Sequence, residues 1–523
     1  MTWIEKITGK RHLAFYLFLT AFVLYLFNSW GVSIYILDEA KNATCAREML
    51  DSHNWLVPTF NFDLRTDKPP LHYFFMMLSY SVFGVNAFAA RFFSAVFGAL
   101  TILVTFIYTR RFSNVKTAFW TAVILLSSIH LSIQFHLAVP DPYLIFFVTW
   151  SLFAFYSAIS GNSRNDWFWM YLSIALATLS KGPVAILLPG FIFLLYLIFS
   201  KNFKWSVIKK AKPFWGVLIV LAIALPWYIL NGLATDWEWT RGFFLEHNLD
   251  RFSDEMEGHG GTFLITFLYV LIGLLPFAFL LPQALVHALK SRKNTFVLLT
   301  LIAGLSIVGF FSVSQTKLPN YTVPAYPFLA FLISHFIQNK LQSFKQVKVA
   351  FFVLLGIGLL LPIAVFVAAK YDPSLLPVRW LSILLFVLPL LLLLAFFQRK
   401  YIQKFLLFIG LSGVLTSVIF FGIIYPRIDQ QNPVSKSINE LQNREVVYYQ
   451  KFNPAYAFYL QKKIERIDST DFESFFNEYP DGRIISTTRW INEIELAPDN
   501  KVIFSGKDLF ESPTTVLIAK ERN

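Results

Sequence analysis

Long apolar segments recur along most of this 523-residue chain, and no other feature limits its fold as strongly. A helix needs about 20 apolar residues to cross a bilayer. Thirteen segments approach that length, and they lie at 13–36, 88–109, 117–135, 142–159, 166–180, 183–199, 213–231, 262–287, 295–312, 321–338, 347–369, 379–397 and 403–425. The sequence therefore predicts a polytopic α-helical membrane protein with about 13 transmembrane helices.

The loops between these segments differ in charge. With thirteen spans and the N-terminus inside, basic residues such as Arg110 and Lys209 fall in the inside loops, whereas most acidic residues fall outside. This distribution follows the positive-inside rule. The 71–83 segment is short for a span, and counting it as one would break the charge pattern. We therefore expect it to lie at the interface or to re-enter.

Composition excludes several classes of protein. Only 15% of the residues are charged and 56% are hydrophobic, whereas soluble domains contain about 25% charged residues. The single cysteine, Cys45, excludes an internal disulfide framework and a cysteine-rich metal site. The net charge of +13 is what basic cytoplasmic loops supply, so we expect no nucleic-acid partner.

The chain changes character after Tyr425-Pro426. We expect residues 1–426 to form the membrane domain, with long outside loops at 37–70 and 232–261. Residues 427–523 hold many charges and no membrane-length apolar run, which indicates a small soluble domain on the outside. An α/β fold is predicted by one helix pattern at 471–479 and by strand patterns at 444–449, 483–487, 501–505 and 515–519.

The first outside loop begins with two carboxylates, Asp38 and Glu39, directly after the first span. Residues 41–50 are compatible with a helix, which places both carboxylates in its first turn at the membrane surface. Two interpretations fit this position. The charges favour the helix N-terminus electrostatically, or one of them is a general base exposed to a lipid-borne substrate.

The same loop ends in Asp67-Lys68-Pro69-Pro70. The two prolines restrict the backbone, so Lys68 cannot lie within a helix that continues through them. A lysine held at this level can bind a phosphate. It can equally be an interfacial lysine whose charged end reaches into water.

Motifs in this loop resemble a known superfamily. Asp38-Glu39, Ala46-Arg47-Glu48-Met49-Leu50 and Asp67-Lys68-Pro69-Pro70-Leu71 look like the start of GT-C glycosyltransferases that use lipid-linked sugars. These include the bacterial aminoarabinose transferase that modifies lipid A and the protein O-mannosyltransferases. The resemblance continues in family order with Ala90-Arg91-Phe92, Asp141-Pro-Tyr-Leu144, Leu179-Ser-Lys181-Gly-Pro183, Gly273-Leu-Leu-Pro276 and Ser314-Gln-Thr-Lys317-Leu-Pro319-Asn-Tyr321. It covers nearly the whole membrane part of the chain and is more specific to the superfamily than to a substrate.

The resemblance implies an inverting transferase that takes a sugar from a polyprenyl-phosphate carrier outside the membrane. Asp38, with Glu39 beside it, would supply the catalytic carboxylate that orients or deprotonates the acceptor. Lys68 would neutralise the donor phosphate, a form of charge stabilisation that dominates many active sites. Further candidates for binding this phosphate are Lys41, Arg47, Lys181 and Lys317. Lys41 stands where the aminoarabinose transferase usually has arginine, and lysine keeps the charge but loses the bidentate fork.

Asp141 follows the third span on the outside, just before the next apolar run. One interpretation is an ordinary helix start after Pro140. The other is a functional carboxylate at membrane depth, and with the resemblance we favour a substrate-binding role. Lys181 and Lys317 each lie two residues before a proline at outside span ends, where a lysine binds phosphate or marks the interface.

The second outside loop holds His247 and Arg251, two candidates for substrate binding, and then Gly258-His259-Gly-Gly261. The glycines suggest a segment able to close over substrate. In the aminoarabinose transferase an acidic residue before the lysine and a histidine in this loop hold a metal, and the matching positions are Asp67 and His259. The resemblance thus implies a divalent metal such as Zn or Mg. One carboxylate and one distant histidine are by themselves a weak metal signal.

Two other classes of protein compete with a glycosyltransferase. A transporter or flippase of lipid-linked sugars needs ionisable groups near mid-span, and the span centres are almost free of charge. A non-catalytic assembly subunit has no need for Asp38 and Lys68 together. We therefore predict a monomeric glycosyltransferase in the bacterial inner membrane, with its active site and C-terminal domain in the periplasm. Its acceptor would be lipid A, another glycolipid or a protein.

Overall fold

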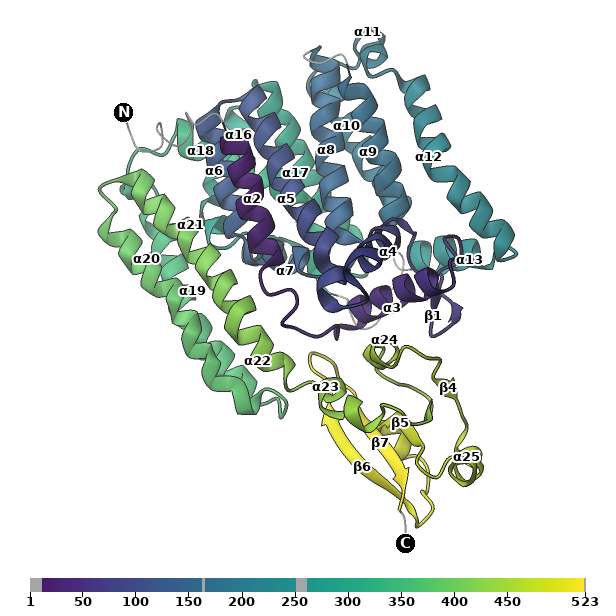
Figure 1. Cartoon of the computed structure of the whole chain (residues 1–523). Helices are drawn as coiled ribbons and strands as arrows, with labels where there is room; N and C mark the ends of the chain where they lie inside the picture. Colours follow the sequence, from purple (N-terminus) through teal and green to yellow (C-terminus); the bar gives the residue numbers. More distant parts are fainter. Residues whose placement is uncertain (1–11, 162–164, 251–260, 522–523) are drawn as a thin grey trace.

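The computed structural model describes residues 12–161, 165–250 and 261–521. Apolar helices form a bundle, and a small sheet follows at one end of it (Figure 1). The main helices of the bundle are α2 (Leu13–Leu26), α5 (Ala87–Phe112), α6 (Val115–Ser127), α8 (Asp141–Ser160), α9 (Asp166–Lys181), α10 (Val184–Phe199), α12 (Pro213–Ala234), α16 (Leu281–Lys290), α17 (Thr295–Val313), α18 (Tyr326–Asn339), α19 (Lys348–Lys370), α20 (Val387–Phe397) and α21 (Ile402–Ile419). The other α-helices before the C-terminal region are α3 (Leu37–Asp51), α4 (Leu71–Phe83), α7 (Ile129–Phe135), α11 (Trp205–Ile208), α13 (Glu238–Arg241), α15 (Ile265–Gly273) and α22 (Tyr425–Asp429).

Twelve of the thirteen predicted spans coincide with helices over most of their length, and the first, 13–36, does so only in its first half. Within the described residues, seven helices are long and apolar enough to cross a membrane, or nine if each of two bent pairs is one span. The bends are 69° between α6 and α7 and 116° between α15 and the segment 277–290 that contains α16. The other four predicted spans match α2, α9, α10 and α18, which have 14 to 16 residues. The fold class is confirmed, and the number of crossings stays a prediction.

Asparagine side chains start several of the bundle helices. The Asn86 side chain accepts a hydrogen bond from Ala89 N at the start of α5, and Asn114 does the same for Thr117 N at the start of α6. Each cap satisfies a backbone N–H that has no partner within its helix. Polar caps at these ends suit chain turns between apolar spans.

The first predicted span, 13–36, is wrong in its second half. α2 ends at Leu26, and residues 27–36 form an irregular connection that we call the α2–α3 segment. Asn28 adopts a positive φ of 57°, and asparagine, serine and glycine at 28, 29 and 31 are weak helix formers. The hydropathy of Val32, Ile34 and Ile36 was misleading, because two of these three side chains are buried in protein outside a helix.

The helix that follows, α3, lies between the membrane helices and the C-terminal region. A second hydrophobic core surrounds it and is separate from the main core of the bundle. This core joins Ala43, Ala46 and Met49 of α3, Met76 and Tyr80 of α4, and Ala457, Phe458 and Ile464 of the C-terminal region. The position of α3 therefore depends on elements that lie more than 400 residues later in the chain.

The C-terminal region contains a five-stranded sheet in the order β4-β3-β5-β7-β6. β3 is parallel to β4 and β5, whereas β7 is antiparallel to β5 and β6. The strands are β3 (Val446–Tyr448), β4 (Glu465–Arg466), β5 (Arg483–Thr487), β6 (Asn500–Lys507) and β7 (Thr514–Lys520), and the helices are α23 (Pro433–Ser437), α24 (Ala455–Leu460), α25 (Phe472–Glu478) and α26 (Thr488–Ile491). The four predicted strands and the helix at 471–479 are confirmed. β4 has two residues, too few for a periodic signal.

The predicted outside loops lie together at one end of the bundle. α3 and the two-residue strands β1 (Thr59–Phe60) and β2 (Asp63–Leu64) come from the first loop, and α13 comes from the second. In Figure 1 they lie at the end that carries the C-terminal sheet, and α11 lies at the opposite end. The compartment that each end faces, and the exact domain boundary at 426, stay predictions.

Candidate active site

Asp38 and Glu39 lie in the first turn of α3, as predicted, and point into different surroundings. Successive residues of a helix are rotated by about 100°, so adjacent side chains cannot face the same neighbour. The Asp38 side chain is 55% exposed and lies 3.8 Å from Lys68, measured from Oδ2 to Nζ. Glu39 is completely buried.

Lys68 is held by the Pro69-Pro70 turn that begins α4. Pro70 is the N-terminal flanking residue of α4, and the Lys68 side chain is only 9% exposed beside Asp38. Burial raises the pKa of Asp38, but the positive charges of Lys68, Arg65 and Lys41 lower it by more. The pKa of Asp38 therefore lies below its usual value. Asp38 is therefore ionised at neutral pH.

Asp67, next to Lys68, is paired with Arg65. Arg65 donates from Nη2 to Asp67 Oδ2 at 3.0 Å and also from Nε to Oδ1. Burial raises the pKa of Asp67, but the charges of Arg65 and Lys68 and the hydrogen bond from Arg65 hold it well below its usual range. This fork fixes the loop backbone on either side of residue 66 and so helps to place Lys68.

A cavity of about 450 Å³ lies beside Lys68. Most of its wall is apolar and comes from side chains such as Leu144, Leu187 and Phe311. The polar and charged residues that line it are Asp67, Lys68, Asp141, Lys181, His247, Ser314 and Asn320. An apolar cavity with a few convergent polar groups is the usual form of a ligand site, and this one suits a lipid that carries an anionic group.

Asp141 and Lys181 form the second charged contact of the cavity. Lys181 Nζ, at the end of α9, lies 2.7 Å from Asp141 Oδ1, at the start of α8. Asn320 donates to the same oxygen at 3.0 Å, and the Lys181 ammonium lies 5.1 Å from the centre of the Tyr321 ring. Asn320 and Tyr321 belong to one of the motifs of the resemblance, but no role was predicted for either residue.

Of the remaining candidates, His247 lines the cavity and Lys41 lies close enough to Asp38 to lower its pKa. Lys317 donates from Nζ to the backbone oxygen of Ser314, a cavity residue, at 2.7 Å. Arg251 and His259 lie outside the described residues.

Glu39 is placed away from the cavity, in a buried ion pair. Arg91 on α5 donates to Glu39 from Nε at 2.8 Å and from Nη2 at 2.7 Å. Ala138 N donates to the same carboxylate at 2.9 Å. A carboxylate with these three donors is well suited to fixing α3 against the bundle, and its predicted catalytic role remains unsupported. The sequence pointed to this pair only weakly, through an arginine (Arg91) in an apolar helix and an acidic residue (Glu39) at a helix start.

Arg47 also lies away from the cavity. Its Nη1 donates to Ala457 O of α24 at 3.0 Å, and its Nη2 donates to Glu48 Oε1 at 3.3 Å. Glu48 in turn accepts from Thr59 Oγ1 at 2.7 Å and from Phe62 N at 3.0 Å. Arg47 therefore fixes the first outside loop to the C-terminal region, a contact that its predicted role in phosphate binding did not anticipate.

The described residues do not fit a metal site. They contain no group of three histidine, cysteine, aspartate or glutamate side chains placed to hold a metal ion. Both oxygens of Asp67 accept from Arg65, and a divalent ion at that carboxylate would have to displace the arginine. We derive no step of the reaction through a metal.

Comparison with known proteins gives relatives over most of the chain. The dolichyl-phosphate-mannose-protein mannosyltransferase family matches residues 67–230. An uncharacterized protein of Aquifex aeolicus is 30% identical over 447 residues, which are 83% of this chain and 85% of that protein. An undecaprenyl phosphate-α-4-amino-4-deoxy-L-arabinose arabinosyl transferase of Pseudomonas fluorescens is 30% identical over 332 residues, or 62% of this chain. The matched region spans 59% of that transferase.

Solved structures share the fold over nearly the whole length. The crystal structure of ArnT from Cupriavidus metallidurans bound to undecaprenyl phosphate superposes with a TM-score of 0.82. It covers 97% of this chain and 98% of that one at 20% sequence identity. The apo form of the same protein gives a TM-score of 0.81. This similarity extends to the C-terminal sheet as well as the helix bundle.

Proposed function

Because this chain belongs to the GT-C superfamily of polyprenyl-phosphate-sugar glycosyltransferases, we propose that it transfers a sugar from an undecaprenyl-phosphate-type donor to a lipid A-like glycolipid. The observation that carries this proposal is the contact between Asp38 and Lys68 at the edge of a largely apolar cavity. A base and a cation beside a largely apolar cavity are what such a transfer needs. The names of the related transferases favour an aminoarabinose-type donor.

In the proposed reaction an acceptor oxygen attacks the anomeric carbon on the face opposite the phosphate. The new carbon–oxygen bond forms as the bond to the phosphate oxygen breaks, and that electron pair leaves with the phosphate. The configuration at the anomeric carbon is therefore inverted. Phosphate is a good leaving group, so this step needs charge stabilisation more than acid catalysis.

Lys68 and Lys181 would bind the donor phosphate. Both line the cavity, and an ammonium group forms short, strong hydrogen bonds to phosphate oxygens. Their charge offsets the negative charge that develops on the leaving oxygen. The polyprenyl chain would lie against the apolar wall, where Leu187 and Phe311 provide surface.

Asp38 would orient the acceptor and take its proton. Its lowered pKa keeps it ionised, as a base must be, but a carboxylate of low pKa is a weak base. Orientation of the acceptor is therefore its larger contribution, with proton transfer late in the reaction. A half-exposed carboxylate beside the cavity leaves room for such an acceptor.

The remaining features of the proposal concern location and assembly. We place the protein in the bacterial inner membrane with the cavity end towards the periplasm, because the charge distribution of the loops favours that orientation. We propose that the protein acts as a monomer.

Mass spectrometry of total lipids, lipid A and envelope glycoproteins tests the proposal. Three strains are compared: wild type, a deletion strain, and the deletion strain carrying Asp38→Asn. The proposal requires one glycolipid mass to vanish in both mutants while a polyprenyl-phosphate sugar accumulates. If Asp38→Asn restores the wild-type pattern, the catalytic assignment is wrong. If the lost mass belongs to a glycoprotein, the acceptor class is wrong.

A further inference from the structure

The α2–α3 segment, residues 27–36, carries the helix that presents Asp38. Its backbone bonds are short turns near its start, from Phe27 N to Leu24 O, Ser29 N to Leu26 O and Gly31 N to Asn28 O, and one bond at its end, where Ile36 O accepts from Ala40 N of α3. None of these bonds involves residues 32–35. The placement of Asp38 therefore depends on groups that hold this segment from other elements.

Arg91 holds the segment from within the helix bundle. Its Nη1 donates to Ser29 O and Val32 O, each at 2.8 Å, and its Nη2 donates to Ser33 O at 2.8 Å. The same guanidinium pairs with Glu39. One buried side chain thus fixes both the segment and the first turn of α3.

Asp429, at the junction between the last membrane helix and the C-terminal region, holds the same segment. It is the last residue of α22 and accepts from Ser33 N at 2.8 Å, and from the Ser33 hydroxyl as well. Asn432 donates from Nδ2 to Ser33 Oγ and to Asp429 Oδ1, each at 3.0 Å. Ser33 is therefore bound through both its backbone and its side chain, five residues before Asp38.

The C-terminal region adds two hydrogen bonds at the next residues. Ile34 N donates to the Tyr459 hydroxyl at 2.8 Å. The Tyr35 hydroxyl accepts from Leu509 N at 2.8 Å. The two bonds thus join two consecutive residues of the segment to two different parts of the C-terminal region.

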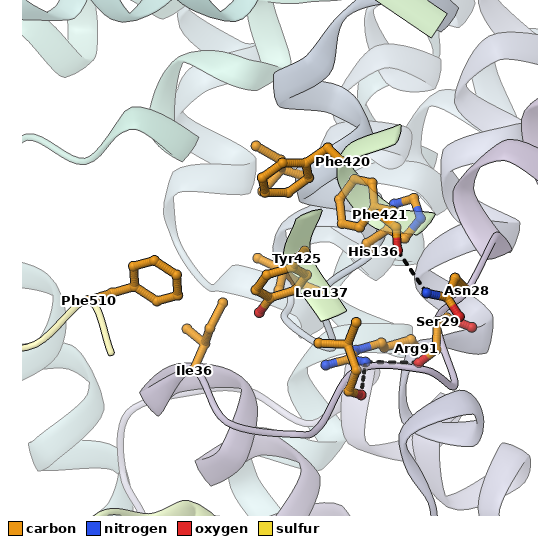
Figure 2. A pocket seen from close by; sticks show the side chains of 12 residues that line it. Asn28, Ser29, Ile36, Arg91, His136, Leu137, Phe420, Phe421, Tyr425 and Phe510 are labelled. Carbon is orange, nitrogen blue, oxygen red and sulfur yellow. Dashed lines mark hydrogen bonds between the residues drawn. The ribbon is translucent and has the colours of Figure 1, made fainter. Parts of the chain in front are cut away.

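Packing alone does not fix the segment, because a cavity of about 130 Å³ borders it. Asn28, Ser29, Val32 and Ile36 line one part of this cavity. Figure 2 shows Asn28 bonded to the backbone of Phe421, and Arg91 bonded to the segment beside the cavity. Side chains next to a void lose dispersion contacts on that side. The directional hydrogen bonds are then what fix the segment on its cavity side.

We propose that Asp429 is a positioning residue for the transfer reaction. It holds Ser33 so that Asp38 stays at the correct distance from Lys68 and from the bound acceptor. The inference rests on the proposed function, since it concerns the reaction that Asp38 assists. It assigns the junction between the last membrane helix and the C-terminal region a role in catalysis through geometry, without contact with substrate.

The test compares Asp429→Asn, Ser33→Ala and the double variant as purified full-length proteins. The donor is the polyprenyl-phosphate-sugar fraction extracted from the deletion strain, and the acceptor is lipid A from that strain. The substituted amide is isosteric with the carboxylate but keeps only one acceptor oxygen, so it cannot accept from both Ser33 N and the Ser33 hydroxyl as Asp429 does. Small misplacements of a reacting group can cost orders of magnitude in rate, and we expect kcat to fall about tenfold in Asp429→Asn.

Three readouts separate positioning from general stability. The KM for the donor and the binding of undecaprenyl phosphate should stay at wild-type values in Asp429→Asn, because Lys68 and Lys181 are untouched. The losses in the double variant should be less than additive, because Ser33→Ala removes a hydroxyl bond to the same carboxylate that Asp429→Asn alters. The matched control is Asp372→Asn, which breaks a different contact with the C-terminal region, Lys507 Nζ to Asp372 Oδ2 at 3.1 Å. It should lower thermal stability and leave kcat unchanged.

The inference is overturned if Asp429→Asn keeps the wild-type kcat, or if Asp372→Asn lowers kcat by the same factor. Additive losses in the double variant would also contradict it. Asp38→Asn separates this failure from failure of the proposed function. If Asp38→Asn is inactive while Asp429→Asn is normal, only the positioning role is wrong. If Asp38→Asn transfers sugar at the wild-type rate, the proposed function itself is wrong.

Discussion

The first turn of α3 carries two acidic residues that make two very different ion pairs. Asp38 approaches Lys68 at 3.8 Å, with 55% of its side chain exposed. Its neighbour Glu39 is fully buried and receives two hydrogen bonds from Arg91, both shorter than 3 Å, and a third from Ala138 N. The Asp38–Lys68 pair is therefore long and has a half-exposed carboxylate, whereas the Glu39–Arg91 pair is short, buried and fully hydrogen-bonded.

This difference indicates that one pair is available to substrate and that the other has a structural role. The Asp38–Lys68 contact is longer than a hydrogen bond and one of its partners is half exposed, so substrate can displace it more readily than a short, buried pair. Removing one partner of a buried pair leaves an uncompensated charge and costs several kcal/mol. We infer that the Asp38–Lys68 pair can open for the acceptor and the donor phosphate, whereas the Glu39–Arg91 pair cannot.

Asp38→Asn should have the largest effect on activity. Loss of a positioned base typically lowers the rate by about 10²- to 10⁴-fold, and this variant also loses the charge that orients the acceptor. Because the side chain is half exposed, the melting temperature should stay close to the wild-type value. Transfer rate and thermal unfolding, measured on the same preparation, check both parts. A low rate accompanied by a large loss of stability would mean that Asp38 is structural.

Glu39→Gln should give the reverse result. Arg91 would lose its charged partner in a buried site, and the expected loss of stability is about 3 kcal/mol. Protein that remains folded should lose only about tenfold in transfer rate, because Glu39 is fully buried against Arg91 and acts by fixing α3 rather than by contacting substrate. The measurement is thermal unfolding in detergent together with the rate per folded molecule. Glu39→Gln with normal stability and no activity would contradict the contrast between the two acids.

Lys68→Met should weaken donor binding more than it affects folding. A hydrogen bond to a charged group contributes about 1.5–3 kcal/mol, so the dissociation constant for undecaprenyl phosphate should rise about 10- to 100-fold. The methionine fills a similar volume, which limits the loss of stability. Binding is measured on the intact protein without acceptor. Wild-type affinity in Lys68→Met would remove this lysine from the phosphate site.

The sequence predicted the fold from hydropathy, and motifs and loop position singled out five of the polar and charged residues of the cavity. Asp67, Lys68, Asp141, Lys181 and His247 all line one cavity, although they come from four different stretches of chain. These residues could be predicted because each lies in a loop or at a span end on the side that the charge pattern predicts to be outside, where chain direction restricts its position.

Residues within α3 were predicted less well. Arg47 is nine residues from Asp38, which is about two and a half helical turns and places it on the opposite face. Its partner Ala457 lies 410 residues away, and no local pattern identifies such a contact. The α2–α3 segment was missed for a related reason: its apolar side chains face protein rather than lipid, and hydropathy does not distinguish the two.

Lys41→Gln should have the smallest effect and should appear mainly in the pH profile. Lys41 helps to lower the pKa of Asp38, but Lys68 and Arg65 contribute more. Without it, the Asp38 pKa should rise slightly. A base must be deprotonated to act, so activity is lost as pH falls through this pKa, and a raised pKa moves that loss to higher pH. The rate at pH 7.5 should stay within about twofold of wild type, and Lys41→Arg, which keeps the charge, should leave the acidic limb of kcat/KM unchanged. An acidic limb that moves to lower pH in Lys41→Gln would mean that a group other than Asp38 titrates in the reaction.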